Sequence, residues 1–122
     1  MVLIDTSVWI SLYRKEKVSI GQKMWLLVAE NRAALCGQVW VEYLSGFRKE
    51  SERRTHEKSL QSFPFLETTR KAYEIAADLL AAYPRLGPGN SIIAATAMAS
   101  DSLLFTLDKD FSALTREGLR LF

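Results

Sequence analysis

Acidic residues follow two strongly apolar segments of this chain. Residues 2–4 lead directly into Asp5, and residues 103–107 lead into Asp108, with Asp110 two positions further on. Because parallel strands end at a common edge of an α/β sheet, acids placed directly after them come close together. Grouped carboxylates repel one another unless a cation joins them, and Mg²⁺ and Mn²⁺ favour such oxygen ligands. The pattern therefore predicts a divalent metal site suited to phosphate chemistry.

Two further polar residues are candidates for the same site. Glu42 lies in a predicted helix, to one side of its apolar stripe, so it can face the sheet edge while the stripe packs. Asn90 lies at the first turn of another predicted helix, where it is also a favourable N-cap. Asp5 and Asp108 are the strongest ligand candidates, and Asp110 is a further one. The hydroxyl groups expected to donate to the carboxylates or to phosphate are those of Thr6, Ser7 and Thr106.

The elements that position these residues alternate along the chain. Hydrophobic periodicity predicts strands at residues 2–5, 33–36, 63–66, 103–107 and 119–122. Helices are predicted at residues 6–13, 19–30, 38–48, 49–59, about 75–83 and 90–100, and a helical turn at 111–114. Thr6 or Ser7 is the predicted N-cap of the first helix. This order predicts one α/β domain over residues 1–122, a three-layer α/β/α sandwich with a mostly parallel sheet of four to five strands.

Bulk properties limit the classes of protein further. The 122 residues and 48% hydrophobic content suit one globular domain, and a net charge of +2 does not by itself predict nucleic-acid binding. Cys36 is the only cysteine, so no disulfide can form within the chain and a cytoplasmic location is expected. Neither a signal peptide nor a membrane-spanning segment is expected from the sequence.

Three sequence blocks together resemble the PIN-domain family, and in particular VapC-type toxin ribonucleases of type II toxin–antitoxin systems. The blocks are residues 2–10, Val41-Glu42 with its helix, and residues 90–97 together with 104–111. The resemblance implies that Asp5, Glu42, position 90 and Asp108 form the catalytic and metal-binding set, often accompanied by an acid such as Asp110. It also implies hydrolysis of RNA phosphodiester bonds with Mg²⁺ or Mn²⁺, a homodimer, and a cognate antitoxin.

Position 90 departs from the family pattern, which has aspartate where this chain has asparagine. The change keeps the shape of the side chain and removes one negative charge. An amide oxygen still binds a hard cation, but more weakly than a carboxylate does. Two explanations remain open: a deliberate substitution that disarms a toxic nuclease, or a natural one that leaves a weakened enzyme.

Other functions fit the sequence less well. A PIN-like module that binds RNA or an antitoxin without cutting is the principal alternative, and Asn90 favours it. A receiver domain would need a second acid beside Asp5, where Thr6 stands. The basic residues of segment 48–58 alternate with glutamates, which favours an exposed helix face over an RNA-binding patch. Tryptophans at positions 9, 25 and 40 are expected in the core or at an interface.

Overall fold

The computed structural model describes residues 1–122, in which a four-stranded parallel sheet has the strand order β3-β2-β1-β4. The elements are β1 (Val2–Ile4), α1 (Thr6–Arg14), α2 (Val18–Ala29), β2 (Ala33–Cys36), α3 (Gly37–Ser45), α4 (Glu50–Leu60), β3 (Phe65–Leu66), α5 (Arg70–Ala82), the 3₁₀ helix η1 (Pro84–Leu86), α6 (Pro88–Ala99), β4 (Leu103–Phe105) and the 3₁₀ helix η2 (Lys109–Glu117). The predicted α/β class with a parallel central sheet is confirmed.

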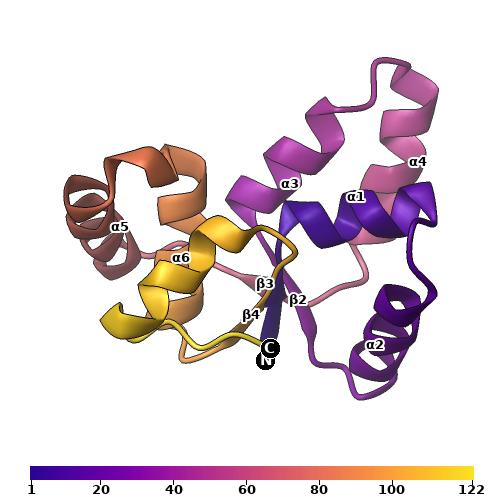
Figure 1. The fold of residues 1–122 in the computed structure, drawn as a ribbon. Helices are drawn as coiled ribbons and strands as arrows, with labels where there is room; N and C mark the ends of the chain where they lie inside the picture. The colour runs from indigo at the N-terminus through magenta and orange to yellow at the C-terminus, as the bar shows by residue number, and fades with distance from the viewer.

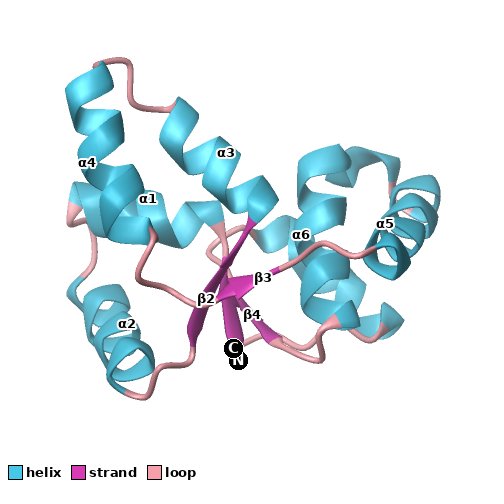
Figure 2. Cartoon of the chain, turned by 180° about the vertical axis from the view of Figure 1, so that it is seen from behind, coloured by secondary structure: helices cyan, strands magenta, loops and turns pink.

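Helices cover both faces of the sheet. Figure 1 shows α5 and α6 on one side and α1 and α2 on the other, while α3 and α4 rise beyond the ends of the strands. The reverse view in Figure 2 shows the same three layers. None of these helices has the length and apolar character needed to cross a membrane.

The two central strands are buried on both faces, as their uninterrupted apolar sequences predict. All residues of β1 and β2 are buried, and 28 buried hydrophobic residues form one core cluster. In the register of the sheet, Ile4 of β1 lies beside Phe105 of β4. The residues that follow these two strands therefore lie side by side at the same edge.

Several element boundaries differ from the sequence-based predictions. The fourth strand ends at Phe105, because the Thr106 hydroxyl and the Leu107 amide turn towards side chains at the start of α1. The predicted strand at 119–122 is wrong: Gly118 turns the chain with φ of 105°, and a single bridge, from Leu104 to Leu121, joins the following segment to the sheet.

Both predicted helix caps are also wrong. Asp5 holds the N-cap position of α1, in place of Thr6 or Ser7, although its side chain caps no backbone amide. Helix α6 begins two residues before Asn90, at Pro88, whose fixed φ suits the first turn of a helix. Gly87 is its N-cap residue and has φ of 82°, a conformation that glycine adopts without strain.

The tryptophans have different environments. Trp9 is buried in the core, and Trp40 is half-buried and packs edge-on against Phe65. Trp25 lies outside the core, because 69% of its surface is exposed on α2.

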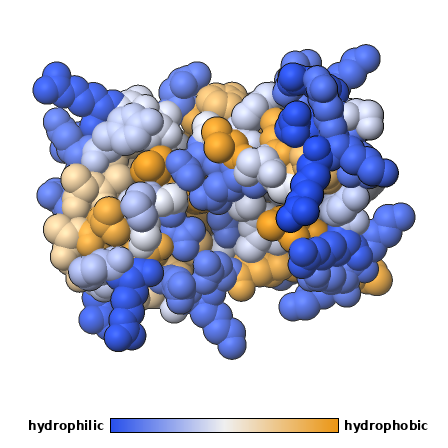
Figure 3. Space-filling model, turned by 90° about the horizontal axis from the view of Figure 1, so that it is seen from above, coloured by the Kyte–Doolittle hydropathy of each residue, from blue (hydrophilic) through white to orange (hydrophobic).

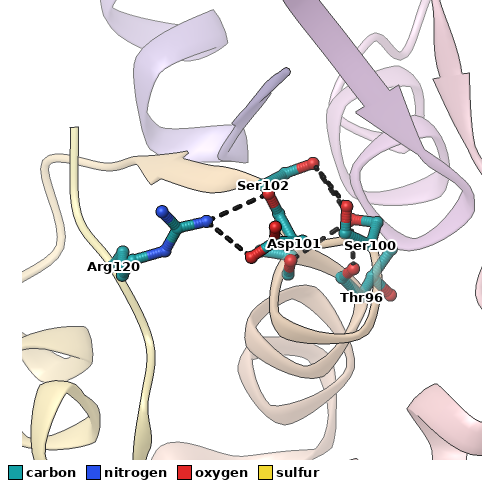
Figure 4. Close-up of polar contacts among 6 residues, drawn as sticks. Thr96, Ser100, Asp101, Ser102 and Arg120 are labelled. Carbon is teal, nitrogen blue, oxygen red and sulfur yellow. Dashed lines mark hydrogen bonds and ion pairs between the residues drawn. The ribbon is translucent and has the colours of Figure 1, made fainter.

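A polar turn fixes α6 to β4. Asp101 has the left-handed φ of 54°, and the Arg120 guanidinium donates to both its backbone oxygen, at 3.0 Å, and its carboxylate, at 2.8 Å (Figure 4). The Ser100 hydroxyl donates to the Thr96 carbonyl at 2.7 Å and closes the last turn of the helix. The C-terminal segment thus secures the strand that leads into the acidic edge.

Leu3→Ala is expected to lower the free energy of unfolding by about 2–5 kcal/mol, because it leaves a cavity between the central strand and its helices. Leu3 is 0% exposed, whereas Leu26 on α2 is 53% exposed. Leu26→Ala, the matched control, is expected to change it by less than about 0.5 kcal/mol. Urea unfolding of both variants makes the comparison, and equal losses would contradict the assignment of the core.

Candidate active site at the carboxyl edge of the sheet

Asp5 is the most buried acid of the candidate site. It follows β1, is 3% exposed, and is held in place by the backbone hydrogen bond from its amide to the Phe105 carbonyl, at 2.9 Å. Its Oδ2 accepts hydrogen bonds from the hydroxyls of Ser7, at 2.6 Å, and Thr106, at 2.8 Å. Its Oδ1 accepts none. A carboxylate that has one oxygen fixed by two hydroxyls and the other free of protein donors is well suited to receive a cation.

Thr106 connects this carboxylate to the second acid. Its hydroxyl donates a hydrogen bond to Asp5 and accepts one from the backbone amide of Asp108, at 3.0 Å. The Ser7 hydroxyl in turn accepts a hydrogen bond from the backbone amide of Leu107, at 3.0 Å. The loop after β4 is therefore bound to the start of α1, and Asp108 lies two residues beyond the contact with Asp5.

Glu42 reaches the same edge from α3. Thr6 donates to its Oε1 at 2.7 Å, and Gln38, one helical turn earlier, donates to its Oε2 at 2.9 Å. Both carboxylate oxygens are thus held by groups on two different helices. Since Thr6 directly follows Asp5, the same segment positions both acids.

Glycine at position 89 allows α6 to approach this glutamate. A Cβ added to Gly89 would lie 2.5 Å from Oε2 of Glu42 and 3.1 Å from Nε2 of Gln38. Neither Gln38 nor Gly89 was among the sequence-based site candidates. For Gln38 the sequence did hold a signal, because it lies four residues before Glu42 on one helix face. The need for a small residue at position 89 depends on tertiary packing and has no local signal.

Asn90 is the third residue of α6 and faces the second acid. Its amide nitrogen lies 3.4 Å from Oδ2 of Asp108, a long hydrogen bond. The other oxygen of Asp108 accepts a hydrogen bond from the backbone amide of Asp110, at 2.9 Å. The Asp110 side chain itself is exposed and makes no hydrogen bond to the other site residues. Asp5, Glu42, Asn90 and Asp108 are therefore brought together, while Asp110 lies at the margin.

The acids of this edge are spaced apart by other polar groups. No three His, Cys, Asp or Glu side chains lie close enough together to enclose an ion. Hydroxyl and amide groups separate the acids instead. The oxygen ligands that this edge offers to a cation are the free oxygen of Asp5, the carboxylate of Asp108 and the amide oxygen of Asn90.

Cys36 lies at the end of β2, near these acids, but has no chemical role in this arrangement. Burial raises the pKa of its thiol, and the charges of Glu42 and Asp5 raise it further, against the lowering effect of the Val39 and Gln38 amides. A thiol in this environment stays protonated and unreactive at neutral pH.

The face that carries the site is polar at its centre. Figure 3 looks onto the end of the molecule where the strands finish, and hydrophilic residues occupy the middle of this face with hydrophobic ones exposed beside them. A polar centre with apolar flanks can receive a charged backbone together with less polar groups attached to it.

The sequence model of the PIN domain matches residues 2–117, so the chain belongs to the PIN domain family. The resemblance noted in the sequence is confirmed. The chain is 27% identical over 124 residues to a VapC ribonuclease of Mycobacterium bovis, covering 95% of this chain and 92% of that protein. Ribonuclease VapC11 of Mycobacterium tuberculosis gives the same identity and coverage.

Solved structures show the same fold at lower identity. VapBC2 from Rickettsia felis, bound to a DNA fragment from its promoter, matches with a TM-score of 0.79 and 19% identity, covering 100% of this chain and 98% of that one. VapBC-1 from nontypeable Haemophilus influenzae matches with a TM-score of 0.80 and 16% identity, covering 100% and 97%.

Thr106→Val is expected to lower the free energy of unfolding by roughly 1–3 kcal/mol, because the Asp5 carboxylate loses a donor and the Asp108 amide loses its acceptor. Thr115→Val removes an exposed hydroxyl that donates only to the Ser112 carbonyl, and is expected to cost less than about 0.5 kcal/mol. Chemical denaturation in EDTA compares them. Equal small costs would show that the Thr106 hydroxyl does not connect the two strand ends.

Gly89→Ala is expected to displace the Glu42 carboxylate while changing the free energy of unfolding by less than about 1 kcal/mol, since a flexible side-chain end can yield and alanine favours helix. Gly21→Ala is the control, because an added Cβ there meets nothing within 4 Å. A crystal structure of each variant measures the distance from Thr6 Oγ1 to Glu42. An unmoved carboxylate in Gly89→Ala would contradict the close approach of α6.

Proposed function

We propose that this chain is a ribonuclease toxin of the VapC type, which hydrolyses RNA phosphodiester bonds with Mg²⁺ or Mn²⁺ bound at the carboxyl edge of its sheet. The observation that carries the proposal is the convergence of Asp5, Glu42 and Asp108 through the hydroxyls of Thr6 and Thr106. Membership of the PIN domain family and relatives named as VapC ribonucleases support the same activity.

The residues would divide the work as follows. Asp5 and Asp108, with the amide oxygen of Asn90, would hold the ion, which when bound polarises a phosphate and lowers the pKa of a coordinated water. Glu42 keeps a fixed position through Thr6 and Gln38, and so can orient the attacking water by accepting its hydrogen bond. Ser7 and Thr106 hold the Asp5 carboxylate in one orientation. Asp110, whose side chain is exposed, would be an accessory acid.

Asn90 favours a second version of the proposal, in which the chain binds its partners but cleaves weakly. The amide contributes one negative charge fewer than the aspartate of the family pattern, and its nitrogen is turned towards Asp108. A neutral donor beside a carboxylate partly replaces the role of a cation and weakens the attraction for one. The weakened enzyme and the non-cutting module differ in the residual RNA cleavage by the parent chain. This cleavage is measured against that of the Asn90→Asp variant.

The relatives also suggest partners. A solved structure similar to this chain, with 24% identity and a TM-score of 0.76, is a toxin–antitoxin complex from Klebsiella pneumoniae. We infer a cognate antitoxin and a homodimer for this chain, acting in the cytoplasm. Exposed apolar side chains on α2, with Val18 80% and Trp25 69% exposed, support contact with another protein.

Asn90→Asp is expected to tighten Mg²⁺ or Mn²⁺ binding by roughly ten- to hundredfold, because it restores a carboxylate to the ligand set. RNA cleavage is expected to rise with it and to stop in EDTA. Isothermal titration with Mn²⁺ and gel analysis of single-stranded and structured RNA measure the two effects.

Asp5→Asn in the Asn90→Asp background is the matched control, since it removes a carboxylate and keeps the shape. It should abolish both the tight metal binding and the cleavage. An Asn90→Asp protein that binds Mn²⁺ tightly yet leaves every RNA intact would reject the enzyme and favour the binding module.

A further inference from the structure

A small pocket opens beside the acidic site, between α1, α3 and the start of α4. Its volume is about 240 Å³, below the ~300 Å³ at which sites for drug-sized ligands begin. Glu42 forms part of its wall, so a group in this pocket lies next to whatever binds at the acidic edge. The other lining residues are Ile10, Tyr13, Arg14, Tyr43, Gly46, Phe47, Arg48 and Glu52.

Aromatic rings from α1, α3 and the segment after α3 line the pocket, and His56 of α4 packs against them. Phe47 stacks on His56 with ring centroids 4.2 Å apart, and Tyr13 packs edge-on against both, at 5.1 and 5.2 Å. Tyr43 lies 5.2 Å from Phe47, and its hydroxyl is 3.3 Å from Nδ1 of His56. Phe47 and Tyr43 are buried, whereas Tyr13 is 50% exposed. The Tyr13 ring is therefore held in position and still offers a free surface for stacking.

Charged groups surround this aromatic wall. Arg48 makes no ion pair or side-chain hydrogen bond, and Arg14 pairs only loosely with Glu16, at 3.6 Å. Two neighbouring arginines of α4 are engaged: Arg53 donates to the Phe47 carbonyl, and Arg54 pairs with two glutamates of the same helix. The carboxylate of Glu52 offers an acceptor for amino or imino groups. An apolar partner would need none of these charges.

We infer that this pocket binds an unpaired nucleobase of RNA, next to the phosphate held at the acidic edge. The inference rests on the proposed function and adds to it a subsite for the substrate. Aromatic side chains stack on any base, and arginines beside them neutralise the flanking phosphates. Because a base inside a duplex cannot enter such a pocket, the subsite selects single-stranded segments.

The test measures RNA binding by fluorescence anisotropy in EDTA, where the chain does not cleave. The probes are a labelled 12-nucleotide single-stranded RNA of mixed sequence and an oligomer of abasic ribose phosphates of the same length. Tyr13→Ala is expected to weaken binding of the RNA by roughly five- to hundredfold and to leave binding of the abasic oligomer unchanged. Tyr13→Phe, which keeps the ring, should bind as the parent does.

Tyr73→Ala is the matched control, because Tyr73 is similarly exposed, at 53%, on α5. It should not change RNA binding. Arg48→Gln should weaken binding of both oligomers, since its contact is with the backbone. Circular dichroism melts confirm that each variant is folded.

Four outcomes would overturn the subsite. RNA binding that is equal in Tyr13→Ala and the parent removes the base contact but leaves the nuclease proposal intact. Equal losses for the base-bearing and abasic oligomers assign Tyr13 to the backbone. Unchanged RNA binding combined with lost binding of the protein encoded immediately upstream would make the pocket a protein-docking site. Failure of the parent chain to bind any RNA would overturn the subsite and the proposed substrate together.

Discussion

The buried carboxylate of Asp5 is the group on which the architecture of the site depends. It stands where β1 becomes α1, and the hydroxyls of Ser7 and Thr106 bind one of its oxygens. Burying a charge is costly unless hydrogen bonds or an opposite charge compensate it. The two hydroxyls compensate in part, and they bind the loop after β4 to the start of α1. The remaining oxygen has no partner, which is the feature that makes a cation useful here.

The other acids are placed by helices that approach this point closely. Glu42 is held between Thr6 and Gln38, and Gly89 leaves room for its carboxylate. Asn90 follows at the next position of α6 and faces Asp108. A charge is thus missing at the position where the chain departs from the family pattern, while the hydrogen bonds around it persist. This combination explains how the fold can be complete in a chain for which we propose a reduced metal affinity.

Local sequence rules predicted the parts of the fold that depend on strand and helix periodicity. The buried strands at 2–4 and 33–36 were evident because they are apolar throughout, and acids directly after strands indicated a shared edge. The caps at Asp5 and Gly87 and the absence of a strand at 119–122 were not predicted, since they depend on turn geometry. Gly89 acts across helices that are distant in sequence, so only the packed structure reveals it, whereas the four-residue spacing of Gln38 and Glu42 on one helix was a local signal.

A paramagnetic titration tests the central claim most directly, that Asp5, Asn90 and Asp108 together offer a site for a divalent cation at this edge of the sheet. Mn²⁺ added in substoichiometric amounts to ¹⁵N-labelled protein broadens the amide signals of residues close to the ion. The account predicts that the signals of Asp5, Thr106, Asp108 and Asn90 disappear first and together. Broadening that begins instead on the exposed glutamates of α4, or is spread evenly over the surface acids, would contradict it.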